Sequence, residues 1–170
     1  MRVGIVTTWF ERGAAYVSWL YRQALLTQGA EVFIFARGGE EQHRSGSAWD
    51  VPNVHRASFT LSGGTTLRKR EFISWIRRNN LDVVLFNEQK WLPPVLWARE
   101  LGVTTAAYVD YYTEKTIPEF VAYDVVLCNT RRHYSAFDWH PGAFYVPWGT
   151  DVQTYRPSEG WPRVQGPIKL

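Results

Sequence analysis

The chain of 170 residues has a single cysteine, Cys128. This excludes an internal disulfide framework and a cysteine-based metal site. Cys128 lies in an apolar run, residues 125–128, so we expect a small buried side chain rather than a reactive thiol. The four histidines also lack the spacing of metal ligands, and we expect no metal site and surface or loop positions for His43, His55, His133 and His140.

Long apolar runs are absent as well. None approaches the roughly 20 residues that a membrane-spanning helix needs. The N-terminal residues 1–6 lead directly into a strand pattern without a signal peptide. These absences predict a cytoplasmic protein.

An excess of charge of one sign is also missing, because the net charge is only +3. This argues against a nucleic-acid partner. The basic residues 68–70 and 77–78 fall on one predicted helix. They form either a solvated helix face or a surface attracted to anionic lipid, where each Lys or Arg adds about 1 kcal/mol. The second interpretation predicts peripheral contact with the inner face of the membrane.

Three glycine-containing motifs do not occur in the chain: Gly-x-Gly-x-x-Gly, Gly-Lys-Ser/Thr and Gly-x-Ser-x-Gly. Their absence excludes the dinucleotide fingerprint, the P-loop and the nucleophile elbow of hydrolases. A Rossmann-like epimerase or dehydrogenase is therefore disfavoured, since nothing would seat the pyrophosphate of a nicotinamide cofactor. The chain alone offers no complete catalytic machinery.

Short apolar runs and amphipathic helical patterns alternate along the chain. The predicted strands are residues 3–7, 32–36, 54–61, 82–86, 105–109, 124–128 and 144–146. The predicted helices are residues 14–28, 67–79, a helix opening near 93 and closing at 102, and a short one after Thr130. Strands that are apolar throughout indicate a parallel sheet covered on both faces. The sequence thus predicts a Rossmann-like, doubly wound α/β domain with a mostly parallel sheet of about seven strands.

Ligands of such sheets bind beyond the carboxyl ends of the strands. The first strand-to-helix loop, residues 7–14, contains Trp9, Arg12, Gly13 and Ala14. Backbone N–H groups at a helix N-terminus favour anions, and a glycine allows a phosphate or sugar to approach closely. A turn glycine without any ligand explains the same pattern.

The loops after the fourth and fifth predicted strands are rich in polar and aromatic residues. Asn87, Glu88, Lys90, Asp110 and Tyr111 would project into one cleft. Asn87 and Asp110 are suited to capping the following helices. Alternatively, carboxylates and amides beside aromatic rings suit a polyhydroxylated ligand such as a sugar.

The C-terminal part of the chain resembles a known signature. Residues 144–157 are similar to the interdomain segment of GT-B glycosyltransferases of family 4, in which a strand leads into a proline, a polar residue and Gly-x-Asp, here Gly149 and Asp151. Residues 123–130 resemble the family's penultimate strand and the turn after it. Residues 2–32 fit its first strand–helix unit.

The resemblance implies that residues 1–148 form the acceptor-side domain and that residues 149–170 begin a link to a donor-binding domain beyond Leu170. The activity implied is a retaining transfer of a sugar from a nucleotide-diphosphate donor to a saccharide or lipid-linked acceptor, without a further cofactor. By position, the implied roles are donor-phosphate binding for Arg12, Gly13 and Ala14; acceptor binding for Trp9, Asn87, Glu88, Lys90 and Tyr111; catalysis for Asp110; and a hinge for Gly149 and Asp151.

One departure from the family is visible. Many members carry a histidine at the end of the fifth strand, where this chain has Val109. Asp110 or Tyr111 is a candidate substitute for it. A non-catalytic carbohydrate- or nucleotide-binding module remains the alternative function, because a fold alone does not establish activity.

Overall fold

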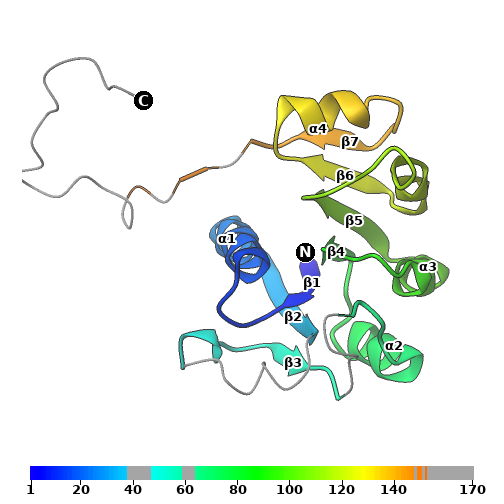
Figure 1. The fold of residues 1–170 in the computed structure, drawn as a ribbon. Coiled ribbons are helices and arrows are strands. Elements are labelled where there is room, and N and C mark those ends of the chain that lie inside the picture. Colours follow the sequence, from blue (N-terminus) through cyan, green and yellow to red (C-terminus); the bar gives the residue numbers. More distant parts are fainter. Residues whose placement is uncertain (38–46, 59–63, 148, 151, 153–170) are drawn as a thin grey trace, which may run out of the picture.

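The computed structural model describes residues 1–37, 47–58, 64–147, 149–150 and 152. Seven strands form one sheet in the order β3-β2-β1-β4-β5-β6-β7, and every neighbouring pair is parallel (Figure 1). The strands are β1 (Arg2–Thr8), β2 (Glu31–Arg37), β3 (Val54–Arg56), β4 (Val83–Asn87), β5 (Thr104–Val109), β6 (Val125–Cys128) and β7 (Ala143–Tyr145). The predicted doubly wound α/β fold is confirmed.

Helices cover both faces of this sheet (Figure 1). One face carries α1 (Gly13–Thr27) and the 3-10 turn η2 (Ser47–Trp49). The other carries α2 (Lys69–Arg78), α3 (Pro93–Glu100) and the 3-10 helix η3 (Ile117–Ala122). The short helix α4 (Arg131–Ala136) contacts β6 and β7. Glycines with positive φ, Gly29 and Gly102, follow α1 and α3, as expected where a helix ends in the left-handed region.

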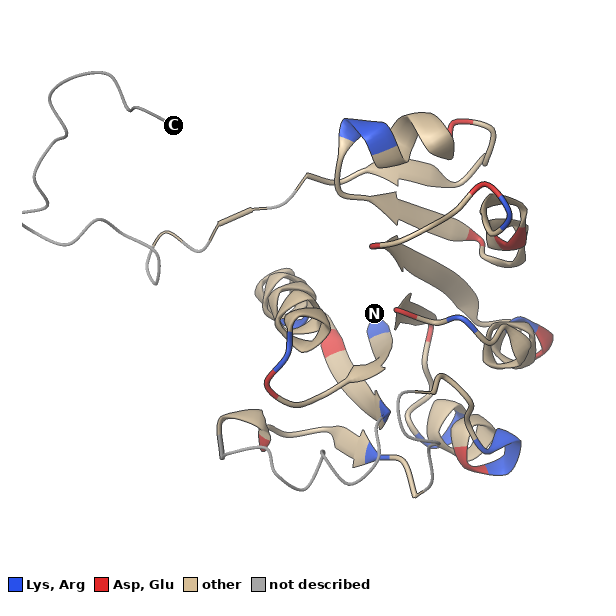
Figure 2. Cartoon of the chain, viewed as in Figure 1, with Lys and Arg blue, Asp and Glu red and all other residues tan. Residues whose placement is uncertain are grey.

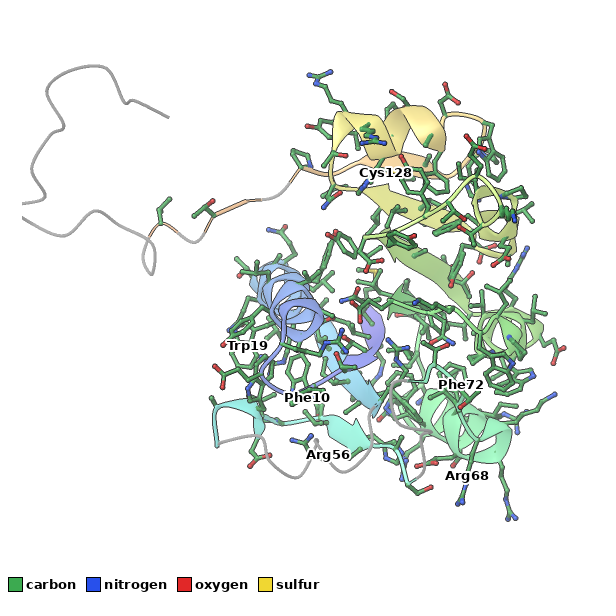
Figure 3. The ribbon with its side chains drawn as sticks, in the orientation of Figure 1. Phe10, Trp19, Arg56, Arg68, Phe72 and Cys128 are labelled. Atoms are coloured by element: carbon green, nitrogen blue, oxygen red, sulfur yellow. The ribbon has the colours of Figure 1, made fainter. Side chains whose placement is uncertain are left out.

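The two faces have separate aromatic cores. On the α1 face, Trp9, Trp19 and Trp49 pack together. Figure 3 labels Trp19 on this side of the sheet and Phe72 on the other. On the α2 face, Phe72 and Trp75 stack with ring centroids 5.9 Å apart. A Cβ on Gly4 in β1 would come within 2.5 Å of the Trp75 ring, so the sheet and α2 approach closely because residue 4 has no side chain.

Several predicted boundaries differ from the structure. The third strand ends at Arg56 rather than at Leu61, and residues 59–61 lie outside the described part of the chain. The helix predicted from Leu67 begins at Lys69. Its buried side chains are Phe72, Trp75 and Ile76, and Trp75 takes the inward place expected of Ile73.

Cys128 is buried and free, as expected from its apolar run. Burial raises the pKa of its thiol to about 11, so it is a protonated core side chain at neutral pH. Within the part of the chain that the structure describes, no helix combines the length and the apolar character needed to cross a membrane.

Candidate functional site

The carboxyl ends of all seven strands meet at one edge of the sheet. The chain winds outward from β1 through β2 to β3, and then returns to build β4 through β7 on the other side. The order therefore reverses between β1 and β4, and in doubly wound sheets ligands bind in the crevice at this point. The loops that begin after β1 and β4 supply the candidate site.

An ion pair joins these two loops. Arg12, directly before α1, places Nη2 3.2 Å from Oε2 of Glu88, directly after β4. The two side chains remain partly exposed, at 44% for Arg12 and 27% for Glu88. The structure thus brings together a predicted donor-side residue and a predicted acceptor-side residue that are 76 positions apart in the chain.

A buried arginine lies beneath this ion pair. Arg37 ends β2 and is 2% exposed. Its Nη1 donates to the Glu88 carbonyl at 3.1 Å and to Gln89 Oε1 at 3.3 Å, and its Nη2 donates to the Asn87 carbonyl. Its Nε has no partner among the described residues.

Burial lowers the pKa of Arg37 to about 10, while the nearby Glu88 charge acts in the opposite direction. The guanidinium is still charged at pH 7. Arg37 is a site residue that the sequence reasoning missed. The available signal was a charged residue following directly on the apolar run of residues 32–36, where the strand was expected to stop.

The backbone at Glu88 is unusual. Its φ is +54°, in the left-handed region that residues other than glycine seldom adopt. Such conformations persist where the surroundings enforce them, and they gather at functional sites. Here the Arg37 bonds to the carbonyls of Asn87 and Glu88 hold the backbone on both sides of the bend.

The predicted acceptor contact of Asn87 needs correction. The side chain is 2% exposed, and Nδ2 donates to the Ala14 carbonyl at 2.8 Å and to Ser18 Oγ at 2.9 Å. Ser18 Oγ in turn donates to Thr7 Oγ1 at 2.8 Å. Asn87 therefore fastens the end of β4 to the first turns of α1, and it does not cap the helix that follows β4.

Trp9 needs the same correction. It is fully buried, its Nε1 donates to the Trp49 carbonyl at 2.8 Å, and its ring stacks on Trp19 at 5.6 Å between centroids. The enclosed Trp9 side chain therefore anchors the β1–α1 loop to the core of the α1 face. The density of tryptophans near residue 9 reflects core packing and not a stacking surface for sugars.

The remaining residues of the predicted phosphate loop are accessible or adjacent to the site. Gly13 begins α1 and is exposed, and a Cβ there would meet nothing within 4 Å. Ala14 is buried and offers its carbonyl to Asn87. No side chain caps α1.

The loop after β5 is open. Tyr111 is 70% exposed, and Asp110 is exposed with Oδ1 accepting only the N–H of Tyr111 at 2.8 Å among the described groups. Lys90, on the neighbouring loop, is also exposed. Gly149 is exposed beyond β7, and Asp151, the other predicted hinge residue, lies outside the described residues.

A histidine from α4 also reaches the end of β5. His133 packs edge-on against Tyr112, with ring centroids 5.3 Å apart. Burial lowers the pKa of His133, and the Asp110 charge and the Val109 carbonyl act against that shift. From the sequence alone, His133 is expected at a surface or loop position, since no local pattern connects it to a strand end more than 20 positions earlier.

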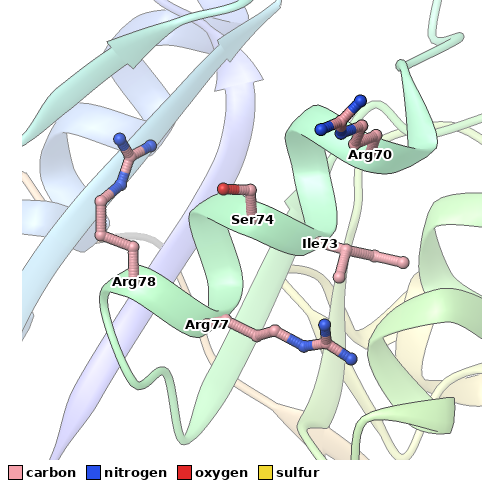
Figure 4. A pocket seen from close by; sticks show the side chains of 5 residues that line it. All are labelled: Arg70, Ile73, Ser74, Arg77 and Arg78. Carbon is pink, nitrogen blue, oxygen red and sulfur yellow. The ribbon is translucent and has the colours of Figure 1, made fainter.

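The outer face of α2 carries a second feature. Arg70, Ser74, Arg77 and Arg78 line a shallow depression together with Ile73 (Figure 4). Figure 2, in which Lys and Arg are blue, shows several basic positions along α2. Across the described residues, no group of three or more His, Cys, Asp or Glu side chains could hold a metal ion.

Comparison with known proteins finds a structural likeness. No protein-family model matches the chain, and no curated protein matches its sequence. Among solved structures, the chain is similar to MurG of Acinetobacter baumannii, with a TM-score of 0.63 and 14% sequence identity. The match covers 95% of this chain and 48% of MurG, so the chain spans about half the length of that protein. At this identity the likeness shows the fold alone, which is a GT-B-like, Rossmann-like domain.

Proposed function

We propose that this chain is the acceptor-side domain of a retaining glycosyltransferase that moves a sugar from a nucleotide-diphosphate donor to a saccharide or lipid-linked acceptor. The likeness to MurG, a GT-B glycosyltransferase, supports the general class. The retaining, family 4 assignment depends on the signature around Gly149 and Asp151. In this proposal a second domain would hold most of the donor.

The observation that carries this proposal is the arrangement of the loops after β1 and β4, where the strand order reverses. Arg12 stands at the start of α1, whose first turn is uncapped by any side chain, and Gly13 leaves space above it. A guanidinium and free N–H groups suit the donor diphosphate, whose negative charge grows as the sugar departs. In this proposal Arg12, Gly13 and Ala14 bind the diphosphate, with the Ala14 contribution coming from its backbone.

The acceptor side of the proposal is carried by exposed and partly exposed residues of the neighbouring loops. Glu88, Lys90 and Tyr111 offer a carboxylate, an ammonium and an aromatic ring, which together suit hydroxyl groups and the apolar face of a sugar. Asp110, accessible and beside His133, is the proposed catalytic carboxylate. Gly149 and Asp151 remain the proposed hinge.

The test is sugar-dependent release of nucleoside diphosphate by the full-length protein. A panel of nucleotide-diphosphate sugars is offered with saccharide and lipid-linked acceptors, and the anomeric configuration of the product is read by NMR. Transfer with retention supports the full proposal, and transfer with inversion removes the family 4 assignment. Ligand binding without transfer from any donor would favour the binding-module alternative.

We also propose that the outer face of α2 contacts anionic lipid when a lipid-linked acceptor is used. Arg70, Arg77 and Arg78 are exposed, and no ion pair joins any of them to an acidic side chain of the described residues. Lys69, in contrast, is 3.8 Å from Glu100. Juxtaposed cations without counter-ions are attracted to an anionic membrane surface.

Vesicle co-sedimentation tests this contact. Full-length protein should bind vesicles containing phosphatidylglycerol more strongly than vesicles of phosphatidylcholine alone. The triple variant R70Q/R77Q/R78Q should lose the difference, and the control R131Q/R132Q, on the exposed side of α4, should keep it. If both variants lost the preference for phosphatidylglycerol equally, net charge alone would explain the binding, and a specific α2 contact would be refuted.

A further inference from the structure

Two arginines converge on Glu88 in different ways. Arg12 contacts the carboxylate, with Nη2 3.2 Å from Oε2 and 3.4 Å from Oε1. Arg37 contacts the Glu88 carbonyl and does not pair with any carboxylate of the described residues within 4 Å. One arginine thus neutralises the side chain, while the other holds the backbone that presents it.

Four charges interact at this point, two of each sign: the guanidiniums of Arg12 and Arg37 and the carboxylates of Glu88 and Asp110. Glu88 and Asp110 are the two carboxylates whose charges reach Arg37, and the Arg12 charge opposes them. Glu88 is the one of these carboxylates that forms an ion pair, and that pair is with Arg12. If Glu88 left Arg12, the Arg12 guanidinium would have no ion-pair partner among the described residues, while Arg37 would stay buried on the carbonyls of Asn87 and Glu88.

A carboxylate on an arginine resembles the contact that a phosphate makes. Both groups present two oxygens to the planar fork of N–H donors. Because Arg12 and Glu88 are partly exposed, their pairing is weak and can be exchanged for a ligand at small cost. Glu88 is directed to this position by a left-handed backbone that few residues other than glycine adopt.

We infer that the Glu88 carboxylate occupies, in the ligand-free protein, the place that a phosphate group of the ligand takes on Arg12, and that Arg37 is the positioning residue that keeps Glu88 there. Phosphate binding and release of Glu88 are then a single exchange on Arg12. The inference rests on the proposed function, because it assigns the diphosphate to Arg12. It adds that Glu88 competes with that diphosphate before it can serve an acceptor.

Calorimetric titration of the full-length protein with inorganic pyrophosphate tests the exchange without requiring turnover. E88Q removes the competing charge, so pyrophosphate should bind about two- to fivefold more tightly. R12Q should weaken binding in both the natural and the E88Q background. The matched control is E31Q, which removes the same charge from an Arg2–Glu31 pair of 3.0 Å at the opposite edge of the sheet. E31Q should leave the affinity unchanged.

The role of Arg37 has its own readout. If Arg37 positions Glu88, R37K should also tighten pyrophosphate binding, and E88Q should add nothing in the R37K background. A merely structural arginine would weaken binding when replaced, and E88Q would keep its effect. R37Q serves as the second variant, with thermal unfolding used to confirm that each variant is folded.

Unchanged or weaker binding in E88Q overturns the exchange, since Glu88 would then be neutral toward phosphate or would support it. An affinity that R12Q leaves unchanged overturns it as well. These results are separate from the failure of the proposed function, which is an absence of sugar transfer by a full-length protein whose pyrophosphate affinity still responds to E88Q and R12Q.

Discussion

The two halves of the carboxyl edge are built differently. In the bonded half, at the ends of β3, β2, β1 and β4, side chains join segments that are distant in sequence: Glu71 accepts from Ser58, Arg37 donates to the β4 end, and Asn87 donates to α1. In the open half, at the ends of β5, β6 and β7, Asp110 and Thr130 accept from N–H groups one and three residues away. Hydrogen bonds between distant segments hold the bonded half, whereas bonds within single turns mainly hold the open half.

This difference suggests how the proposed enzyme divides its work. Preorganised donors are most useful where charge develops in the reaction, and the bonded half is where we propose that the diphosphate binds. Loops with local contacts adapt more easily to a partner, and the open half supplies Tyr111 to the proposed acceptor site, beside Glu88 and Lys90 from the end of β4. Stability is therefore expected to depend mainly on the bonded half.

The largest expected effect is at Arg37. R37M should lower the free energy of unfolding by about 2–4 kcal/mol, because the carbonyls of Asn87 and Glu88 would stay buried without a donor. Removing a buried charge recovers part of this loss, but not the bonds. Urea denaturation measures the change. R132M, an exposed arginine of the open half, is the control and should stay within about 0.5 kcal/mol of the natural protein.

Two asparagines at the carboxyl ends of strands sharpen the comparison between the two halves. Asn87 donates two hydrogen bonds to α1, and Asn129 donates one, to Tyr108 Oη at 2.8 Å. N87A should cost about 1–3 kcal/mol of unfolding free energy and N129A about 0.5–1.5 kcal/mol. The same denaturation experiment ranks them. Equal losses would mean that the open half is held as firmly as the bonded half.

The bonded half should also respond to acid through Glu71. Burial raises the pKa of this carboxyl, but hydrogen bonds from Ser58 and His55 outweigh it, so the folded pKa lies below the ordinary value of 4.5. A carboxyl with a depressed pKa contributes stability above its unfolded pKa, and this share is lost as pH falls through the folded pKa. Unfolding free energy followed downward from pH 6 should therefore fall less steeply in E71Q than in the natural protein. Parallel curves would show that the network around Glu71 is unimportant for acid stability.

The smallest effect on stability is expected in the open half. D110N and Y111A should change the free energy of unfolding by less than about 0.5 kcal/mol, because both side chains are exposed. Their effect should appear in function instead. If Asp110 takes part in proton transfer, D110N should lower kcat of the full-length enzyme by about 100-fold or more. Normal kcat in D110N would remove Asp110 from the catalytic proposal.

Much of the fold was predictable because its signals are local. Continuous apolar strands such as residues 32–36 indicate burial on both faces, and the glycines after α1 and α3 indicate helix ends. The loops that meet at the candidate site were also predictable, because the carboxyl ends of parallel strands lie at one edge of the sheet. The strand order and the neighbours of each loop depend on pairing between distant segments.

The individual roles at the site were less predictable. Trp9 and Asn87 have residue types that suit a sugar, yet both are buried, and burial depends on what packs over them. His133 carried no recognisable pattern, and the only signal for Arg37 was its place directly after an apolar run. The fold brings Arg37 to the end of β4 and His133 to the end of β5. The residue type gives the chemistry of a side chain, whereas its exposure depends on the tertiary structure.

The sequence by itself determined the α/β class, the number and approximate places of the strands, and the loops that meet at one edge, because hydrophobic periodicity is a property of neighbouring residues. Only the tertiary structure decided that Arg12 meets Glu88, that Arg37 lies beneath them, and that Trp9 and Asn87 belong to the interior. These contacts join residues about 40 to 76 positions apart, and their geometry follows from how the strands pair and how the helices cover them.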